Sequence, residues 1–64
     1  MSSTRDRLDA VVERLRAAVD ELDEIAFDVL REASARRDDR PTIDKEIVRA
    51  RRALEKAVAL LSGD

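Results

Sequence analysis

The residues whose chemistry stands out first are five carboxylates that fall within one short segment of the chain. They are Asp20, Glu21, Asp23, Glu24 and Asp28. On a helix, several of these positions share one side, because residues three or four apart are neighbours there. Carboxylate oxygens are the ligands that hard cations such as Mg²⁺ prefer. A solvated or ion-paired helix face gives the same pattern, so we expect no metal and no cofactor.

Two short segments resemble helices of known enzyme families. Glu21-x-x-Glu24 is similar to the first of the paired Glu-x-x-Glu and Glu-x-x-Asp elements of the helical all-carboxylate nucleotide pyrophosphatases, but the second element is absent. Residues 15–25 resemble the opening of the first helix of the helical chorismate mutases. Ala33 stands where that family carries its next active-site arginine, and the chain is too short for three helices. Neither resemblance transfers an activity to this chain.

Arginines gather in the middle of the chain and in its second half. The candidate set is Arg36, Arg37, Arg40, Arg49, Arg51 and Arg52. A guanidinium fork matches phosphate oxygens, so this region indicates an alternative function, in which a helical hairpin binds RNA or DNA. Asp38 and Asp39 interrupt the basic segment, and Phe27 is the only aromatic residue that can stack on a base. We therefore favour pairing of these arginines with the acidic segment.

Side chains for covalent catalysis are scarce in this sequence. It contains no cysteine and no histidine, and its one glycine, Gly63, excludes a glycine-rich phosphate loop. The serines and threonines fall at expected helix ends or in the expected turn, where capping explains them. Lys45 and Lys56 remain as conceivable bases, but nothing in their spacing predicts burial. We therefore expect a protein that is not an enzyme.

The first half of the chain has the apolar spacing of an amphipathic helix. Ser3 and Thr4 can cap its start, with Asp6 in the first turn. Apolar residues then recur in alternating steps of four and three, at Leu8, Val12, Leu15, Val19, Leu22, Ala26, Val29 and Ala33. A second row beside the first consists of Val11, Ala18 and Ile25. Two rows make a stripe wide enough to contact two neighbouring helices. We expect the densest packing in the segment 22–33.

The second half of the chain predicts a turn followed by a shorter helix. Pro41 disfavours helical geometry at Arg40, and residues 35–41 have no apolar period. Thr42 can cap a second helix, and Gly63 can end it. The same alternation of four and three recurs there, at Ile43, Ile47, Ala50, Leu54, Ala57 and Leu61.

These patterns predict an all-α fold in a single domain over residues 1–64. Its elements are a helix over about 4–34, a turn over about 35–41 and a helix over about 42–61. The short connection predicts an antiparallel two-helix hairpin, and we expect it to dimerise into a four-helix bundle. Complementary charge supports this pairing, since Glu32 would approach Lys45 and Asp28 would approach Arg49.

The unequal lengths of the two expected helices leave apolar surface without cover. They measure roughly 45 Å and roughly 30 Å at 1.5 Å per residue, so Leu61 would lie near Arg16. Leu8, Val11 and Val12 would then be exposed. The full set expected to contact a second copy or a helical protein partner is Leu8, Val11, Val12, Leu15, Val19, Leu22, Ile25, Ala26, Phe27, Val29 and Leu30.

A role in protein–protein contacts follows from this surface, as a small regulator, an assembly factor or an accessory subunit. No apolar run reaches the roughly 18 residues of a membrane span, and the N-terminus lacks the apolar core of a signal peptide. We therefore expect a cytoplasmic protein without membrane contact. Its net charge of −2 gives no overall attraction to nucleic acid, which ranks second as a partner.

Overall fold

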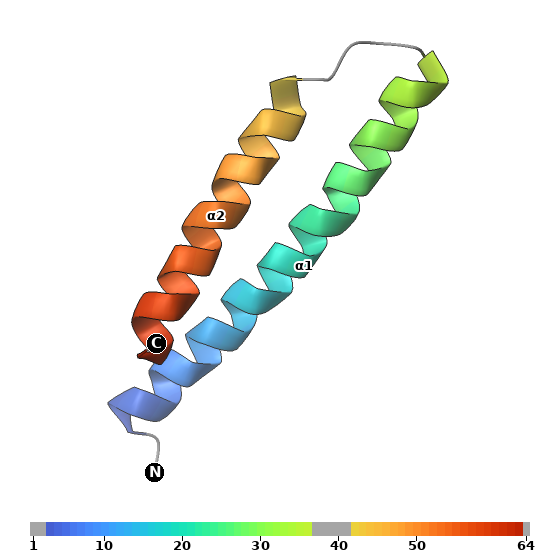
Figure 1. Cartoon of the computed structure of the whole chain (residues 1–64). Coiled ribbons are helices and arrows are strands. Elements are labelled where there is room, and N and C mark those ends of the chain that lie inside the picture. Colours follow the sequence, from blue (N-terminus) through green and yellow to red (C-terminus); the bar gives the residue numbers. More distant parts are fainter. Residues whose placement is uncertain (1–2, 37–41, 64) are drawn as a thin grey trace.

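The computed structural model describes residues 3–36 and 42–63, and these form two α-helices. Helix α1 comprises Thr4–Arg36 and helix α2 comprises Thr42–Ser62. The chain runs along α1 and returns along α2, so the helices pack side by side and antiparallel (Figure 1). The prediction of an all-α fold with two packed helices is confirmed. Helix α1 ends two residues later than predicted, at Arg36, and residues 37–41 of the predicted turn lie outside the described residues.

Capping interactions explain where α1 begins and where α2 ends. The Ser3 hydroxyl accepts a hydrogen bond from the backbone N–H of Asp6 at 3.0 Å, and the Ser3 N–H donates to the Asp6 carboxylate at 3.4 Å. This reciprocal pair satisfies two amides at the start of α1. At the same end of the hairpin, where α2 stops, Gly63 has a φ of 79°, the left-handed conformation that ends a helix. The start of α1 and the end of α2 both agree with the sequence-based expectation.

The interior of the hairpin is a single seam between two helices. Val12, Ala33 and Ile47 are its buried apolar residues, and Val12 retains only 5% of its surface exposed. The molecule measures 53 × 17 × 13 Å, so no second layer covers the helices. Most apolar side chains beside the seam are therefore half-buried rather than enclosed.

The register of the two helices differs from the predicted register, because α2 contacts earlier positions of α1 than expected. Arg51 pairs with Asp23. Among the described residues, neither the predicted Glu32–Lys45 pair nor the predicted Asp28–Arg49 pair forms, and Asp28 pairs with Arg31 on its own helix instead. The extra residues at the end of α1 explain the shift, because α2 then begins beside an earlier turn of α1. The two predicted pairs were wrong.

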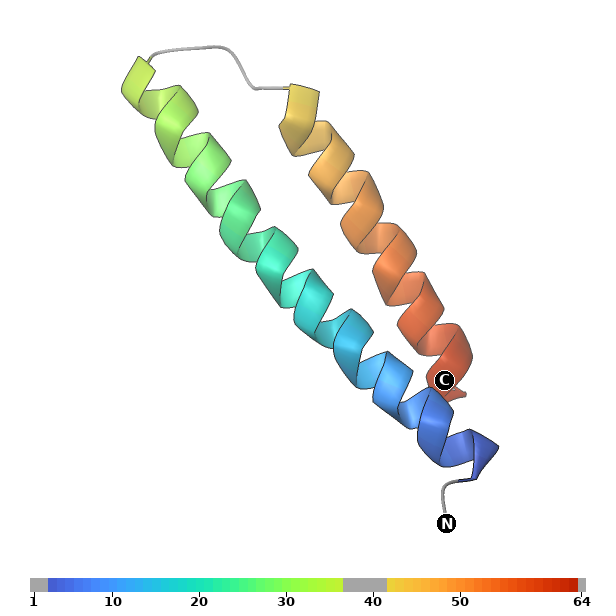
Figure 2. The same ribbon diagram turned by 180° about the vertical axis from the view of Figure 1, so that it is seen from behind.

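This shift carries the end of α2 close to the first turns of α1. The Arg5 guanidinium donates a hydrogen bond to the carbonyl oxygen of Leu61 at 2.5 Å. Seen from behind, only the N-terminal end of α1 projects past the C-terminal end of α2 (Figure 2). Val12 is buried, while Leu8 and Val11 are half-buried. The expectation that these three residues have no cover within the chain is therefore wrong, and it fails most clearly for Val12.

The segment 22–33 of α1 is not the most densely packed part of the chain. Ile25, Phe27 and Leu30 are large exposed apolar residues, and the Phe27 side chain is 65% exposed. Phe27 instead lies beneath the guanidinium of Arg31, which is 5.3 Å from the ring centroid. A single neighbouring helix covers only one stripe of α1, so widening the apolar stripe in this segment increases its exposed surface.

Candidate interaction surface

One side of the hairpin is held together by charge. Arg51 of α2 donates from Nε to Asp23 Oδ1 at 2.6 Å and from Nη1 to Glu55 Oε1 at 2.5 Å. Its hydrogen bond to Asp23 and the negative charges of Asp23, Glu55 and Asp20 raise the pKa of the Arg51 guanidinium above its ordinary value. We call this the ion-paired side, defined by Asp23, Arg51 and Glu55. These three charged groups are paired with one another.

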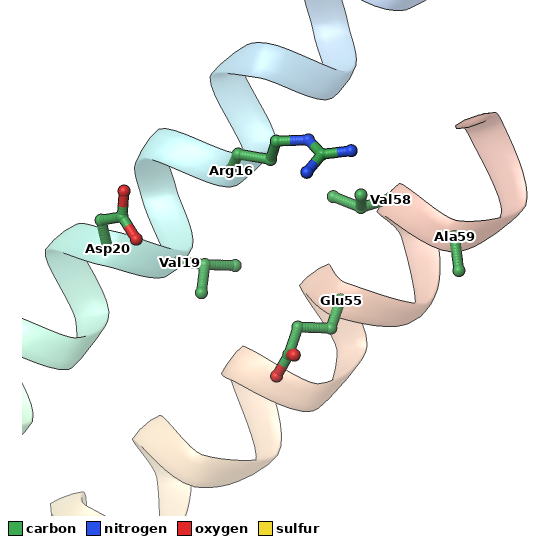
Figure 3. Close-up of a pocket in the computed structure, with 6 residues that line it drawn as sticks. All are labelled: Arg16, Val19, Asp20, Glu55, Val58 and Ala59. Carbon is green, nitrogen blue, oxygen red and sulfur yellow. The ribbon is translucent and has the colours of Figure 1, made fainter. Parts of the chain in front are cut away.

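The same side contains a hollow between the helices, with a volume of about 440 Å³. Its lining residues are Arg16, Val19, Asp20, Glu55, Val58 and Ala59. Figure 3 shows Arg16 of α1 extending toward Val58 of α2, with Val19 between the two helices. Among the described residues, Arg16 and Asp20 make no ion pair. The charged groups at this hollow are therefore one arginine and two carboxylates, and solvent reaches them. None of the lining residues is a serine, threonine, cysteine or lysine that could act as a nucleophile.

On α1, a row of apolar residues lies on the opposite flank from Asp23. The buried row of α1 contains Val12 and Ala33. Around the helix axis, Asp23 lies on one flank of this row. The row Val11, Ala18 and Ile25 lies on the other flank. Leu15 and Leu22 lie between this row and the buried row. Exposure increases along this row, because Val11 and Ala18 are half-buried whereas Ile25 is 47% exposed.

Helix α2 has a matching apolar row on the same side of the hairpin. Its buried residue Ile47 lies between Arg51 on one flank and the row Ile43, Ala50 and Ala57 on the other. Because Arg51 and Asp23 meet on the ion-paired side, the rows that lie away from them share the opposite side. Ile43 and Ala50 are exposed and Ala57 is half-buried. We call this the apolar side, defined by Val11, Ala18, Ile25, Ile43, Ala50 and Ala57.

The residues predicted for a partner interface do not form one surface. Val12 is enclosed within the chain. The half-buried members of the set are Leu8, Val11, Leu15, Val19, Leu22, Ala26 and Val29. Phe27 and Leu30 follow Asp23 by four and seven positions, which places them on the ion-paired side. Of the predicted set, only Val11 and Ile25 therefore belong to the apolar side as defined above.

Two apolar residues of α2 were not foreseen as surface residues. Ile43 belongs to the predicted stripe of α2, yet it is exposed, because it lies on the flank away from Arg51. Leu60 is 71% exposed and lies outside the four-three alternation altogether. Its position between Ala59 and Leu61 gives no sequence signal, whereas the Ile43-Ala50-Ala57 spacing could have indicated the apolar side.

The arginines predicted to contact nucleic acid are separated by the fold. Arg51 is engaged with Asp23 and Glu55. Arg49 and Arg52 line a hollow of about 250 Å³ together with Lys45 and Val48. Arg37 and Arg40 lie outside the described residues, as does the side chain of Arg36. The described basic groups that face solvent together are therefore Lys45, Arg49 and Arg52.

The acidic segment is spread around α1 rather than gathered. Asp23 faces Arg51 and Asp28 pairs with Arg31. Asp20 lies at the hollow of the ion-paired side, while Glu21 and Glu24 are exposed. Within residues 3–36 and 42–63, no three carboxylates come close enough together to hold a metal ion.

No protein family, curated protein or solved structure matches this chain. In the part of the chain that the structure describes, neither helix has a segment that is both long enough and apolar enough to span a membrane.

Proposed function

We propose that this chain is a non-enzymatic protein–protein interaction module that binds a helical partner, in the first place a second copy of itself, on its apolar side. The observation that carries the proposal is the segregation of the hairpin into an ion-paired side and an apolar side. Contiguous exposed apolar surface is a mark of protein contact sites. A small regulator, an assembly factor or an accessory subunit would use such a surface.

Packing supports a partner because the hairpin has only one internal seam. Two helices bury one stripe each, and a domain of 64 residues has a small core even when that core is complete. Transfer of the exposed half of Ile25 into an interface contributes on the order of 1 kcal/mol. Several such residues acting together would stabilise a complex, and a four-helix bundle formed by two hairpins would supply the missing layer.

The test of this function compares two lysine substitutions at exposed apolar positions. Ile25→Lys places a charge on the apolar side, whereas Leu30→Lys places one on the ion-paired side of the same helix. We expect wild type and Leu30→Lys to form the same complex, with a second copy or with one protein of defined stoichiometry from the source cell. Ile25→Lys should weaken that complex at least tenfold. Sedimentation of the purified chains and of the reconstituted complex measures both effects, and equal binding by all three chains would overturn the proposal.

A second candidate function rests on the basic hollow of α2. Lys45, Arg49 and Arg52 face solvent there, and no described carboxylate pairs with them. Backbone phosphates of RNA or DNA would suit this group. Arg49→Glu should abolish a salt-dependent mobility shift of single-stranded RNA or duplex DNA, while the charge-matched Arg31→Glu on α1 should leave most of it. Absence of any shift in dilute salt would exclude this candidate.

A further inference from the structure

Helix α1 carries a second apolar seam that α2 covers only in part. It consists of Leu8, Val11, Leu15, Ala18, Leu22, Ile25 and Val29. The steps along it alternate between three and four residues throughout, as in a coiled coil. None of the seven is buried, and Ile25 is exposed. We call it the outer seam, to separate it from the seam that contains Val12 and Ala33. Its members reach both ends of the apolar side of α1.

The outer seam has a charged rim with a distinctive order. Arg7, Arg14, Glu21 and Asp28 recur every seven residues along its flank, and all four side chains are exposed. The rim is therefore basic in its first half and acidic in its second. Arg7, Arg14 and Glu21 make no ion pair within the described residues, whereas Asp28 pairs with Arg31. Three of these four charges thus have no ion-pair partner among residues 3–36 and 42–63.

This order of charges is complementary to itself in one arrangement. If a second α1 lies antiparallel along the outer seam, Arg14 of each copy meets Glu21 of the other, and Arg7 meets Asp28. A shift of seven residues in one direction sets Arg14 against Arg14. A shift in the other direction sets Glu21 against Glu21. Parallel pairing in register places the charged rims of the two copies on opposite sides of the seam, so none of these attractive pairs forms. Rim charges of this kind select partner and orientation in coiled coils.

The shape of α1 agrees with the same register. A hollow of about 370 Å³ lies at the N-terminal end of the outer seam, and it is lined by Thr4, Arg7, Leu8, Ala10, Val11 and Arg14. In the antiparallel register above, Ile25 of a second copy comes beside Leu8, and Leu22 comes beside Val11. The exposed Ile25 side chain thus stands opposite this hollow in each copy. Near the middle, Leu15 comes beside the small side chain of Ala18, which permits close approach.

We propose that the partner on the apolar side is a second copy of this chain, bound through antiparallel pairing of the two α1 helices about a twofold axis between Leu15 and Ala18. Ile25 fills the Leu8–Val11 hollow of the other copy, and the Arg14–Glu21 pairs set the register. This inference rests on the proposed function, because it identifies the occupant of the apolar side. Twofold symmetry makes each contact occur twice.

Charge reversal tests the register directly. Arg14→Glu opposes two carboxylates in each symmetric contact, and Glu21→Arg opposes two arginines, so each variant alone should dimerise about tenfold more weakly in dilute salt. Mixed together, the two variants restore both attractive pairs. Native mass spectrometry should then find heterodimers well above the statistical proportion. The control Glu24→Arg makes the same charge change on the outer surface and should dimerise like wild type. Random mixing would overturn the register.

Cysteine substitution gives an independent readout, because the chain contains no cysteine. In the proposed register, residue 14 of one copy lies beside residue 21 of the other, and each is distant from its own image. A mixture of Arg14→Cys and Glu21→Cys chains in a glutathione redox buffer should therefore form the mixed disulfide in preference to either homodisulfide. An antiparallel register shifted by seven residues predicts a homodisulfide of one variant, and predominance of a homodisulfide would contradict the proposed register.

The outcomes separate this inference from the proposed function. If wild type stays monomeric at millimolar concentration, self-pairing is wrong, while loss of another partner by Ile25→Lys would still support binding on the apolar side. If wild type dimerises but neither the charge mixture nor the cysteine mixture shows a preference, the register is wrong. If Ile25→Lys dimerises as tightly as wild type, both the inference and the apolar side as binding surface fail.

Discussion

Arg51 of α2 donates two hydrogen bonds to Asp23 of α1, from Nε to Oδ1 at 2.6 Å and from Nη2 to Oδ2 at 3.4 Å. The two residues are 28 positions apart, so their pairing fixes the register of the hairpin. It also fixes which flank of each helix is charged. The apolar rows that lie away from this pair come together on the other side, and the proposed interaction depends on that separation.

The Arg51–Asp23 pair should contribute more to stability than a neighbouring unpaired arginine does. Arg51→Gln is expected to lower the thermal unfolding midpoint, because Asp23 and Glu55 then lose their cation. Arg52→Gln, which removes an exposed arginine one position along, should change the midpoint little. Both side chains of the pair are partly exposed, so the effect should be small and should shrink in roughly 1 M salt. A double-mutant cycle with Asp23→Asn measures the coupling, and zero coupling in dilute salt would contradict the pairing.

The pH dependence of this pair on the alkaline side follows from the raised pKa of Arg51. A cation whose pKa is higher in the folded state stabilises the fold fully below its unfolded-state pKa. That stabilisation is lost only as the pH rises through the folded-state pKa. The stability difference between wild type and Arg51→Gln should therefore be constant from pH 7 to about pH 10, well below the ordinary arginine pKa. Urea unfolding across that range tests this, and a difference that fades before about pH 10 would contradict it.

Two adjacent valines offer a matched comparison of the two seams. Val12 is 5% exposed and faces α2, whereas Val11 is half-buried on the outer seam. Val12→Ala should lower the free energy of unfolding of the monomer by about 2 kcal/mol, because it removes buried methyl groups and leaves a cavity. Val11→Ala should cost clearly less in the monomer. Urea unfolding at low micromolar concentration measures both, and a larger loss for Val11→Ala would reverse the assignment of the seams.

The helices and their ends were predictable because the signals that determine them are local. Ser3 and Gly63 act within one turn of the chain, and the four-three spacing of the apolar residues defines each helix without reference to the other. The width of the stripe on α1 also followed from spacing alone. It indicated correctly that one neighbouring helix would leave apolar residues of α1 uncovered, as the exposed Ile25 shows.

The register was not predictable because it depends on where the turn begins. Helix α1 continues two residues past its predicted end, and Arg51 pairs with Asp23 where the predicted register paired Arg49 with Asp28. Val12 was consequently buried rather than exposed. The burial of Asp44 in the first turn of α2 also escaped prediction, since an acidic residue there is explained by the helix dipole whether it is buried or exposed.

The contribution of the Ser3 cap to the free energy of unfolding can be measured by itself. Ser3→Ala removes the hydroxyl that accepts the Asp6 N–H, so we expect a loss of about 1 kcal/mol. Ser3→Asp retains an acceptor and should recover most of it. Ser34→Ala is the control, because Ser34 is exposed within α1 and alanine favours a helix there. Urea unfolding, monitored by circular dichroism, ranks the stabilities of these variants. A Ser3→Ala variant as stable as wild type would show that the cap is not formed in solution.

The contact between Arg5 and the end of α2 tests the corrected register most directly. The Arg5 guanidinium reaches the Leu61 carbonyl and also pairs with Asp9 at 2.9 Å, so it ties the first turn of α1 to the last turn of α2. A cation at a helix C-terminus stabilises the last carbonyl groups, which lack partners within the helix. Arg5→Gln should therefore increase fraying there, and hydrogen exchange at the last-turn amides of α2 should accelerate several-fold. Arg7→Gln, two positions along and without an ion pair among the described residues, should leave those rates unchanged when measured on the monomer. If α2 ended beside Arg16, as the sequence predicts, Arg5 would be too far away, and both variants would exchange at the wild-type rate.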